Sequence, residues 1–204
     1  MKRMICSTAL LFLALSALAQ TAPAPAAKPA PAQAPKPAPS IAAAVDRQVT
    51  ILEREFVSAA EAMPEDKFGF TPSSLSIPGA EFKGVRTFAE QVKHVATANF
   101  VLWAPITGEK PAYDLSKDNG PDSIKTKAEI IKFLKESFEL GHRAAKSLTP
   151  ESSTETVTTF FGPATPKILA ATYGVAHGFD HYGQMVEYLR MNGIIPPASR
   201  PQPK

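Results

Sequence analysis

Two histidines one helical turn apart are the residues of this sequence whose types and spacing point most directly to chemistry. His177 and His181 are four positions apart in a stretch with the composition of a long helix. At that spacing both rings leave the same face of a helix and could converge on one ion. Imidazole pairs on one helix also occur without a metal, as hydrogen-bonded or surface side chains. The pair therefore predicts a metal site only if another part of the chain supplies a third ligand.

The helix that carries this pair is expected over residues 165–193. Thr165 is the expected N-cap, with Pro166 at the first helical position, where a missing N–H costs nothing. Gly193 offers a left-handed end before two prolines that cannot continue the helix. Residues 150–164, rich in β-branched and aromatic side chains, are expected to form an extended connection into this helix.

Three glycines interrupt the same helix, at Gly174, Gly178 and Gly183. Each costs roughly 1 kcal/mol relative to alanine in a helix interior, so some compensation is expected. Gly174 and Gly178 lie on one stripe of the helix. We expect a neighbouring helix or a substrate to approach the backbone closely there.

Three more amphipathic helices precede this one. Apolar residues recur at three- and four-residue steps from Ile41 until Met63, where a proline follows. Thr-x-x-Glu capping boxes begin the next two helices, at Thr87 and at Thr126. The pattern predicts an all-α fold, a four-helix bundle, in which a long connection over residues 63–86 joins the first two helices.

The other two histidines lie on the middle helices. By position alone, His94 is an ordinary partly buried histidine beside an apolar stripe. Four-helix bundles build metal sites from inward side chains on facing helices, so His94 could meet His177 and His181. Three neutral imidazoles would leave coordination positions for water or substrate. His142 is expected at the surface or rim, beside Arg143, and its role is left open.

The N-terminal part of the chain has the pattern of an export signal. Two basic residues precede an apolar run that ends in a small-x-small site before Gln20, which predicts a cleaved signal peptide over residues 1–19. The run is shorter than the roughly 20 residues that cross a bilayer, so no membrane attachment is expected after cleavage. A Pro/Ala-rich spacer over residues 20–40, the helical domain over 41–199 and a tail over 200–204 follow. The expected location is periplasmic or secreted.

Charge and cysteine content narrow the functional classes. Four of the 22 Lys and Arg, and none of the 19 Asp and Glu, precede residue 41, which leaves 18 basic and 19 acidic residues in the domain. A nearly neutral domain is not expected to bind nucleic acid. Cleavage near Ala19 would remove Cys6, the one cysteine of the sequence. Metal chemistry in the mature protein would then rest on His, Asp, Glu and water.

Three stretches of the chain resemble a known family. FAEQVKHVATANFVLW, MPEDKFGFTP and, above all, HGFDHYGQMVEYLRMNGIIPPAS are similar to the DinB/YfiT-like superfamily of four-helix bundles, over residues 41–199. In that family one histidine of the second helix and two of an H-x-x-x-H on the last helix bind a divalent metal. The resemblance places these ligands on His94, His177 and His181. Relatives are often dimeric, so a homodimer is also expected.

Three functions remain open for such a site. Zinc or nickel suits three imidazoles best, and iron or copper is an alternative. A divalent ion that lowers the pKa of bound water would make the protein a metal-dependent hydrolase acting on a small molecule of unspecified kind. Some relatives resemble thiol-dependent S-transferases, which is the second reading. The third is a metal-binding or interaction module without turnover.

The choice between an enzyme and a module depends on the surroundings of the three imidazoles. Asp180 and Glu187 lie on the same helix as the histidine pair, but position alone gives each only a weak claim as a base. An open pocket above the imidazoles would favour catalysis. Apolar side chains that seal the site, or a fourth protein ligand, would favour the module.

Overall fold

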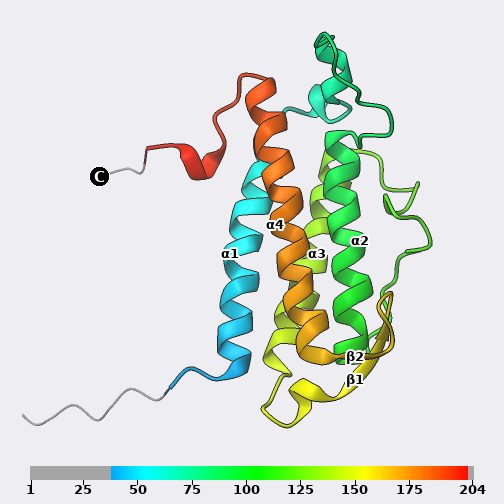
Figure 1. Cartoon of the computed structure of the whole chain (residues 1–204), viewed down its shortest axis with the longest axis vertical. Coiled ribbons are helices and arrows are strands. Elements are labelled where there is room, and N and C mark those ends of the chain that lie inside the picture. The colour runs from blue at the N-terminus through cyan, green and yellow to red at the C-terminus, as the bar shows by residue number, and fades with distance from the viewer. Residues whose placement is uncertain (1–37, 202–204) are drawn as a thin grey trace, which may run out of the picture. The chain divides into compact units, whose positions relative to one another are not determined.

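The computed structural model describes residues 38–201, and four long helices account for most of them (Figure 1). The predicted all-α four-helix bundle is confirmed. A small two-stranded sheet accompanies it. None of the helices in this described part of the chain is long and apolar enough to span a bilayer. The predicted signal peptide, 1–19, lies outside the described residues. The helices are α1 (Ile41–Ala62), α2 (Phe88–Thr107), α3 (Lys127–Lys146) and α4 (Lys167–Met191).

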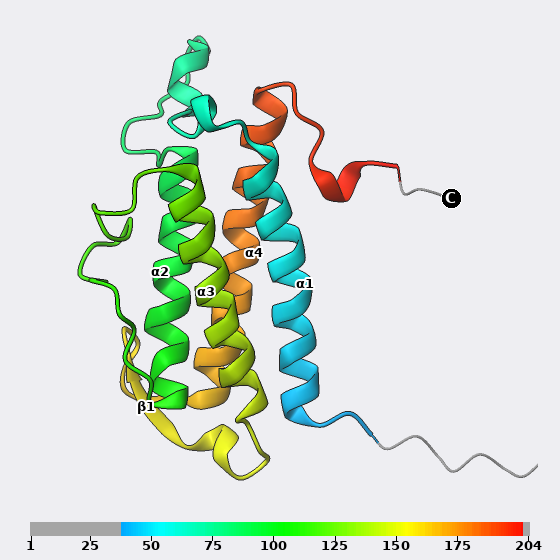
Figure 2. The same ribbon diagram turned by 180° about the vertical axis from the view of Figure 1, so that it is seen from behind.

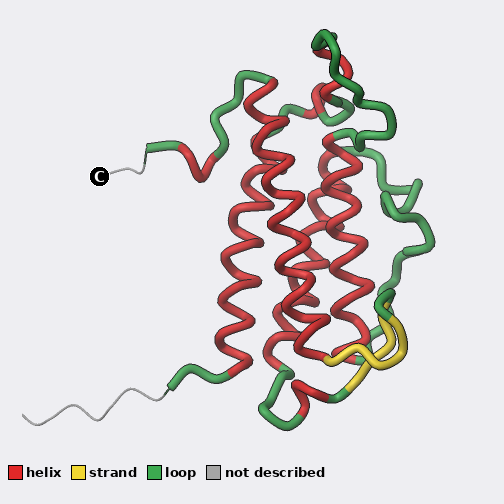
Figure 3. Tube along the Cα trace, in the orientation of Figure 1, coloured by secondary structure: helices red, strands yellow, loops and turns green. Residues whose placement is uncertain are grey.

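The four helices pack as a square in which α1 and α2 occupy opposite corners. Each of these two packs against both α3 and α4, as the two opposite views show (Figures 1 and 2). α1 and α4 run in one direction and α2 and α3 in the other. Because α2 and α3 are parallel, the connection over residues 108–126 must return along the length of the bundle (Figure 3). This crossover passes outside α2 and supplies part of the site described below.

The predicted helix starts are confirmed for α1, α2 and α3. The Ser40 hydroxyl accepts a hydrogen bond from the Ala43 N–H at 3.1 Å and caps α1. Thr87 and Thr126 each form a complete capping box, in which the threonine hydroxyl and the glutamate carboxylate satisfy backbone N–H groups reciprocally. At the far end of α4, Gly193 has a φ of 72°, the left-handed conformation expected there.

The start of α4 differs from the prediction, because the connection before it forms a β-hairpin. Thr165 lies in the second strand, where its hydroxyl donates to the Gly162 carbonyl at 3.0 Å and lies 2.9 Å from the Thr159 hydroxyl. Thr165 as N-cap is therefore wrong, since the hairpin uses its side chain, and α4 begins at Lys167 without a side-chain cap. The antiparallel strands are β1 (Thr156–Thr159) and β2 (Gly162–Pro166).

The expected close approach at the glycines of α4 is confirmed, and side chains of neighbouring helices fill the space. A Cβ on Gly174 would lie 2.5 Å from Nε1 of Trp103, whose other edge meets Gly141 of α3 in the same way. A Cβ on Gly178 would lie 2.4 Å from Cδ2 of Leu52 on α1. These glycines let α4 pack closely against its neighbours, which fixes the position of the histidines one turn further along.

Candidate metal centre

The structure brings together the three histidines that the sequence indicated. His94 comes from the second turn of α2, and His177 and His181 from the middle of α4. Their candidate ligand atoms all lie within 4.8 Å of one another. His94 and His181 are buried and His177 is half-buried. Three imidazoles on two packed helices are therefore close enough to hold one metal ion.

The spacing of the ring nitrogens fits a shared ion. Nε2 of His94 lies 3.1 Å from Nε2 of His177. Two nitrogens bound to one tetrahedral zinc at about 2.0–2.1 Å lie about 3.3 Å apart. Nδ1 of His177 is buried and has no hydrogen-bond partner among the described residues. Buried polar atoms are normally paired, so this nitrogen is an exception, whereas Nε2 of the same ring is within hydrogen-bonding distance of His94.

A chain of hydrogen bonds fixes the tautomer of His181. The exposed Asp180 carboxylate accepts from the Gln184 amide N–H at 3.1 Å, and the Gln184 oxygen accepts from Gln91 at 2.9 Å. The Gln91 oxygen therefore faces Nδ1 of His181, at 2.6 Å. Because an amide oxygen can only accept, Nδ1 carries the proton and Nε2 has the free lone pair.

His94 is oriented in a similar way by the crossover loop. Its Nδ1 lies 2.9 Å from the backbone oxygen of Asp118 and 3.1 Å from the Oδ1 of the same residue. Both oxygens accept, so Nδ1 donates and Nε2 faces His177. Arg86 forms an ion pair with Asp118 and donates to Asn119 at 2.7 Å, which anchors the loop. Burial opposes the charged carboxylate, but the hydrogen bonds and charges of Arg86 and His94 together outweigh burial and hold the pKa of Asp118 below its ordinary value.

The two histidines of α4 are neutral at physiological pH. Burial, followed by the charge of neighbouring imidazoles, lowers the pKa of His177 to about 4 and that of His181 to about 3. A histidine must be unprotonated at the nitrogen that binds a metal. The donor set, three imidazole nitrogens, suits zinc or nickel, with copper or iron also accommodated. The residues present therefore fit a divalent ion.

A cavity of about 460 Å³ lies beside the cluster, and His94 and His177 form part of its wall. Within the described residues, the candidate ligand group contains these two histidines and His181, without a fourth His, Cys, Asp or Glu. The cluster is thus neither sealed nor completed by a fourth ligand from this part of the chain. This is the arrangement that the sequence analysis associated with catalysis.

Sequence reasoning missed Gln91 and Asp118. Gln91 could have been found, because it precedes His94 by three positions and shares its helix face. Asp118 could not, since only the crossover brings it to α2. Of the two acidic residues considered on α4, Asp180 ends the hydrogen-bond chain, whereas Glu187 is exposed.

His142 lies away from the three-histidine group and joins α3 to α1. Its Nδ1 is 2.6 Å from Oδ1 of Asp46, and its Nε2 is 3.0 Å from Oε2 of Glu53. Burial lowers its pKa, but these two carboxylates outweigh burial and raise the pKa above the ordinary value. His142 is an interhelical ion-pair residue at the half-buried rim, consistent with the expected rim position.

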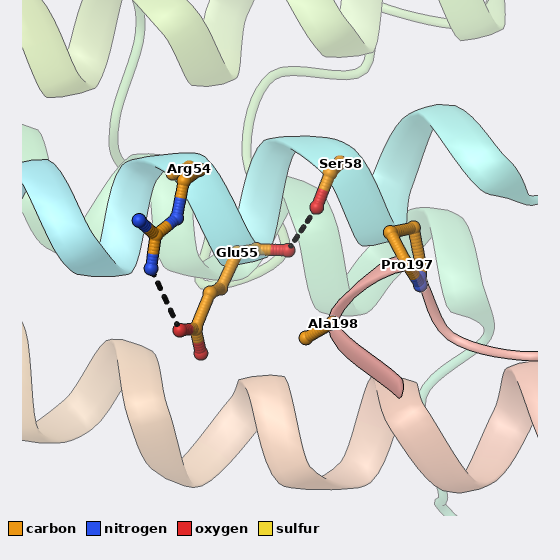
Figure 4. Close-up of a pocket in the computed structure, with 5 residues that line it drawn as sticks. All are labelled: Arg54, Glu55, Ser58, Pro197 and Ala198. Carbon is orange, nitrogen blue, oxygen red and sulfur yellow. Dashed lines mark hydrogen bonds and ion pairs between the residues drawn. The ribbon is translucent and has the colours of Figure 1, made fainter. Parts of the chain in front are cut away.

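A second cavity, of about 450 Å³, has no comparable chemistry. It lies between α1 and the C-terminal 3₁₀ turn (Pro197–Ser199) (Figure 4). Among its described lining residues the one cation, Arg54, pairs with the one carboxylate, Glu55, at 3.3 Å, and there is no histidine. The three-histidine cluster is therefore the stronger candidate site.

Comparison with known proteins places this chain and its fold in a family. No curated protein matches the chain. A DinB-like protein from Bacillus cereus ATCC 10987, known from its crystal structure, is similar with a TM-score of 0.56 and 18% identity, over 75% of this chain and 93% of that chain. This likeness shows the fold. The sequence model of the DinB superfamily matches residues 48–185, more than half of the chain, and the match includes all three clustered histidines. The chain belongs to the DinB superfamily.

Proposed function

We propose that the protein is a metal-dependent hydrolase in which His94, His177 and His181 hold one divalent ion, zinc or nickel in the first place. The observation that carries this proposal is the convergence of three imidazoles, two of which, His94 and His177, form part of the wall of an open cavity. A divalent ion with free coordination positions lowers the pKa of bound water and polarises a substrate carbonyl. Hydrolysis needs no second substrate besides water.

The residues around the histidines would hold the site ready for the ion. Gln91 and the Asp118 backbone oxygen accept the Nδ1 protons of His181 and His94, which turns both Nε2 lone pairs toward the site. Such partners fix ring orientation and raise the basicity of the ligand. Thr97 and Ser116 also line the cavity, and a hydroxyl is a group that can hydrogen-bond a polar group of the substrate, although that of Thr97 already donates to the Lys93 carbonyl. Asp118 is a weak proton acceptor, because its pKa is lowered, so it acts as an anchor.

Two alternatives remain from other classes. A metal-binding module without turnover is favoured by the low pKa of Asp118, since no described group at the cavity wall then offers a strong general base. A thiol-dependent S-transferase has less support, because no lysine or arginine within residues 38–201 lines the cavity to bind an acidic thiol cofactor.

Export from the cytoplasm is part of the proposal. It rests on the basic and apolar pattern of residues 1–19, and on the Pro/Ala spacer that follows. Cell fractionation with N-terminal sequencing of the mature protein tests it. A chain that starts near Gln20 in the periplasm or medium is expected, and an unprocessed cytoplasmic chain would contradict export.

The hydrolase assignment is tested with reconstituted, tag-free protein. Zinc- and nickel-loaded samples are assayed with chromogenic carboxylate and phosphate esters, beside a His177→Ala, His181→Ala double variant. We expect turnover that requires the metal and is absent from the double variant. Stoichiometric metal binding without turnover above that of the variant would favour the non-catalytic module instead.

A further inference from the structure

The cavity beside the histidines has an aromatic mouth that the proposed chemistry does not require. Phe160, in the turn of the β-hairpin, lines it and is 58% exposed. Its ring centroid lies 5.9 Å from that of Tyr173 on α4, which also lines the cavity. Phe161 lies against both rings, with centroids 4.3 Å and 4.7 Å away. Removing the apolar surface of such exposed rings from water is favourable, so a ligand that covers them gains binding free energy.

This aromatic group connects directly to the candidate ligands. The Tyr173 ring is stacked on that of His177, with an interplanar angle of 25° and centroids 6.2 Å apart. Ala98 and Val101 of α2 and Leu115 of the crossover complete the apolar part of the wall. A flat apolar group that enters past Phe160 would therefore be guided toward His177.

The charges of the wall restrict the ligand further. Among the described residues that line the cavity, Asp118 is the one carboxylate and there is no lysine or arginine. Arg86, which compensates this charge, is already paired with Asp118. In the metal-free protein an anionic ligand would meet a carboxylate without a free cation, which disfavours its binding there. The hydroxyls of Thr97 and Ser116 can serve a neutral polar group.

We propose that this cavity binds an uncharged molecule built on an aromatic or similarly flat ring, with its polar group directed at His94 and His177. The proposal rests on the proposed function in one respect, because such a molecule would be the substrate of the metal centre. The volume, about 460 Å³, lies within the range of small-molecule sites. Phe160 and Tyr173 would set the specificity by stacking on the ring.

The experiment measures binding in metal-free, chelator-treated protein, so that no ligand can be held by an ion. Titrations use 2-naphthol and its anionic counterpart 2-naphthoate. We expect saturable binding of 2-naphthol, at least about tenfold tighter than that of 2-naphthoate. The variant Phe160→Ser should weaken 2-naphthol binding at least about fivefold. The control Phe179→Ser, an exposed ring of α4 that contacts Tyr182 and does not line the cavity, should leave it unchanged.

Any of three results would overturn the proposal. These are binding of 2-naphthoate that is as tight as that of 2-naphthol or tighter, no saturable binding of 2-naphthol, and equal effects of the two serine variants on 2-naphthol binding. Metal content is measured on the same samples after reloading. If the protein takes up metal normally but does not bind 2-naphthol, this inference is refuted and the proposed function is not. If 2-naphthol binds as expected but the protein takes up no metal, the proposed function is refuted and this inference is not.

Discussion

Gln91 on α2 accepts a hydrogen bond from Nδ1 of His181 on α4, over 2.6 Å, and ties one candidate ligand to the helix that carries another. Loss of such a supporting partner typically costs 10–100-fold in metal affinity. We therefore expect Gln91→Leu to weaken zinc affinity by about one to two orders of magnitude. Competition titration against a zinc indicator measures this change.

The conservative variant Gln91→Glu is the matched control. Its carboxylate still accepts the Nδ1 proton, so its zinc affinity should stay within a few-fold of the parent. If Gln91→Leu binds zinc as tightly as the parent, the hydrogen bond does not position His181 for a metal.

Asp118 should matter less than Gln91, although it also contacts a histidine. The nearer acceptor for Nδ1 of His94 is the Asp118 backbone oxygen, at 2.9 Å, which a side-chain substitution retains. Asp118→Ala removes the carboxylate at 3.1 Å and the ion pair with Arg86. We expect a loss of zinc affinity smaller than that of Gln91→Leu, in the same titration. A larger loss would mean that the carboxylate, and not the loop backbone, orients His94.

Alanine substitutions at two glycines of α4 should change the free energy of unfolding in opposite directions. A Cβ on Gly174 would overlap Trp103, and overpacking of a core typically costs about 1–3 kcal/mol. Gly174→Ala should therefore lower the free energy of unfolding by that amount. Nothing lies within 4 Å of a Cβ built on Gly183, so Gly183→Ala should raise it by up to about 1 kcal/mol. Urea unfolding of chelator-treated protein measures both, and a stabilised Gly174→Ala would show that Trp103 can move aside.

The raised pKa of His142 predicts how its contribution to stability depends on pH. The folded state holds the proton more tightly than the unfolded state, whose histidine pKa is about 6.5. The stabilisation is therefore complete below about pH 6.5 and is lost as the pH rises through the higher, folded-state pKa. Asp46 and Glu53 supply this preference for the charged imidazole.

The test compares the parent with His142→Gln by urea unfolding at pH 5.5 and pH 8.5, with chelator present throughout. The stability advantage of the parent should be larger at pH 5.5. An advantage that is constant, or larger at pH 8.5, would mean that the Asp46–His142–Glu53 contact does not depend on the charged imidazole.

The helices could be predicted from the sequence because their signals are local. The capping boxes at Thr87 and Thr126 and the apolar period of α1 need no knowledge of distant residues. The pair His177 and His181 was equally visible, since its spacing alone places both rings on one helix face. The third histidine, His94, became a candidate through the bundle pattern and the family resemblance.

The remaining features depend on tertiary structure. The N-cap prediction for Thr165 failed, because the hairpin, which brings the Thr159 hydroxyl within 2.9 Å, competed for the same hydroxyl. Asp118 reaches His94 only because α2 and α3 are parallel and the connection returns along the bundle. The aromatic mouth formed by Phe160 and Tyr173 likewise requires the hairpin to fold over α4. The periodicity of apolar residues along the sequence carries no information on such long-range contacts.

The most direct test of the three-histidine metal site is the metal content of tag-free protein, determined by elemental mass spectrometry. The samples are the parent, the His177→Ala, His181→Ala double variant, and His142→Gln as a histidine control outside the cluster. We predict about one zinc or nickel ion per chain in the parent and in His142→Gln, and little in the double variant. Two results would contradict the metal site. One is a parent protein that takes up no metal after incubation with zinc, nickel or iron salts at neutral pH. The other is a double variant that takes up as much metal as the parent.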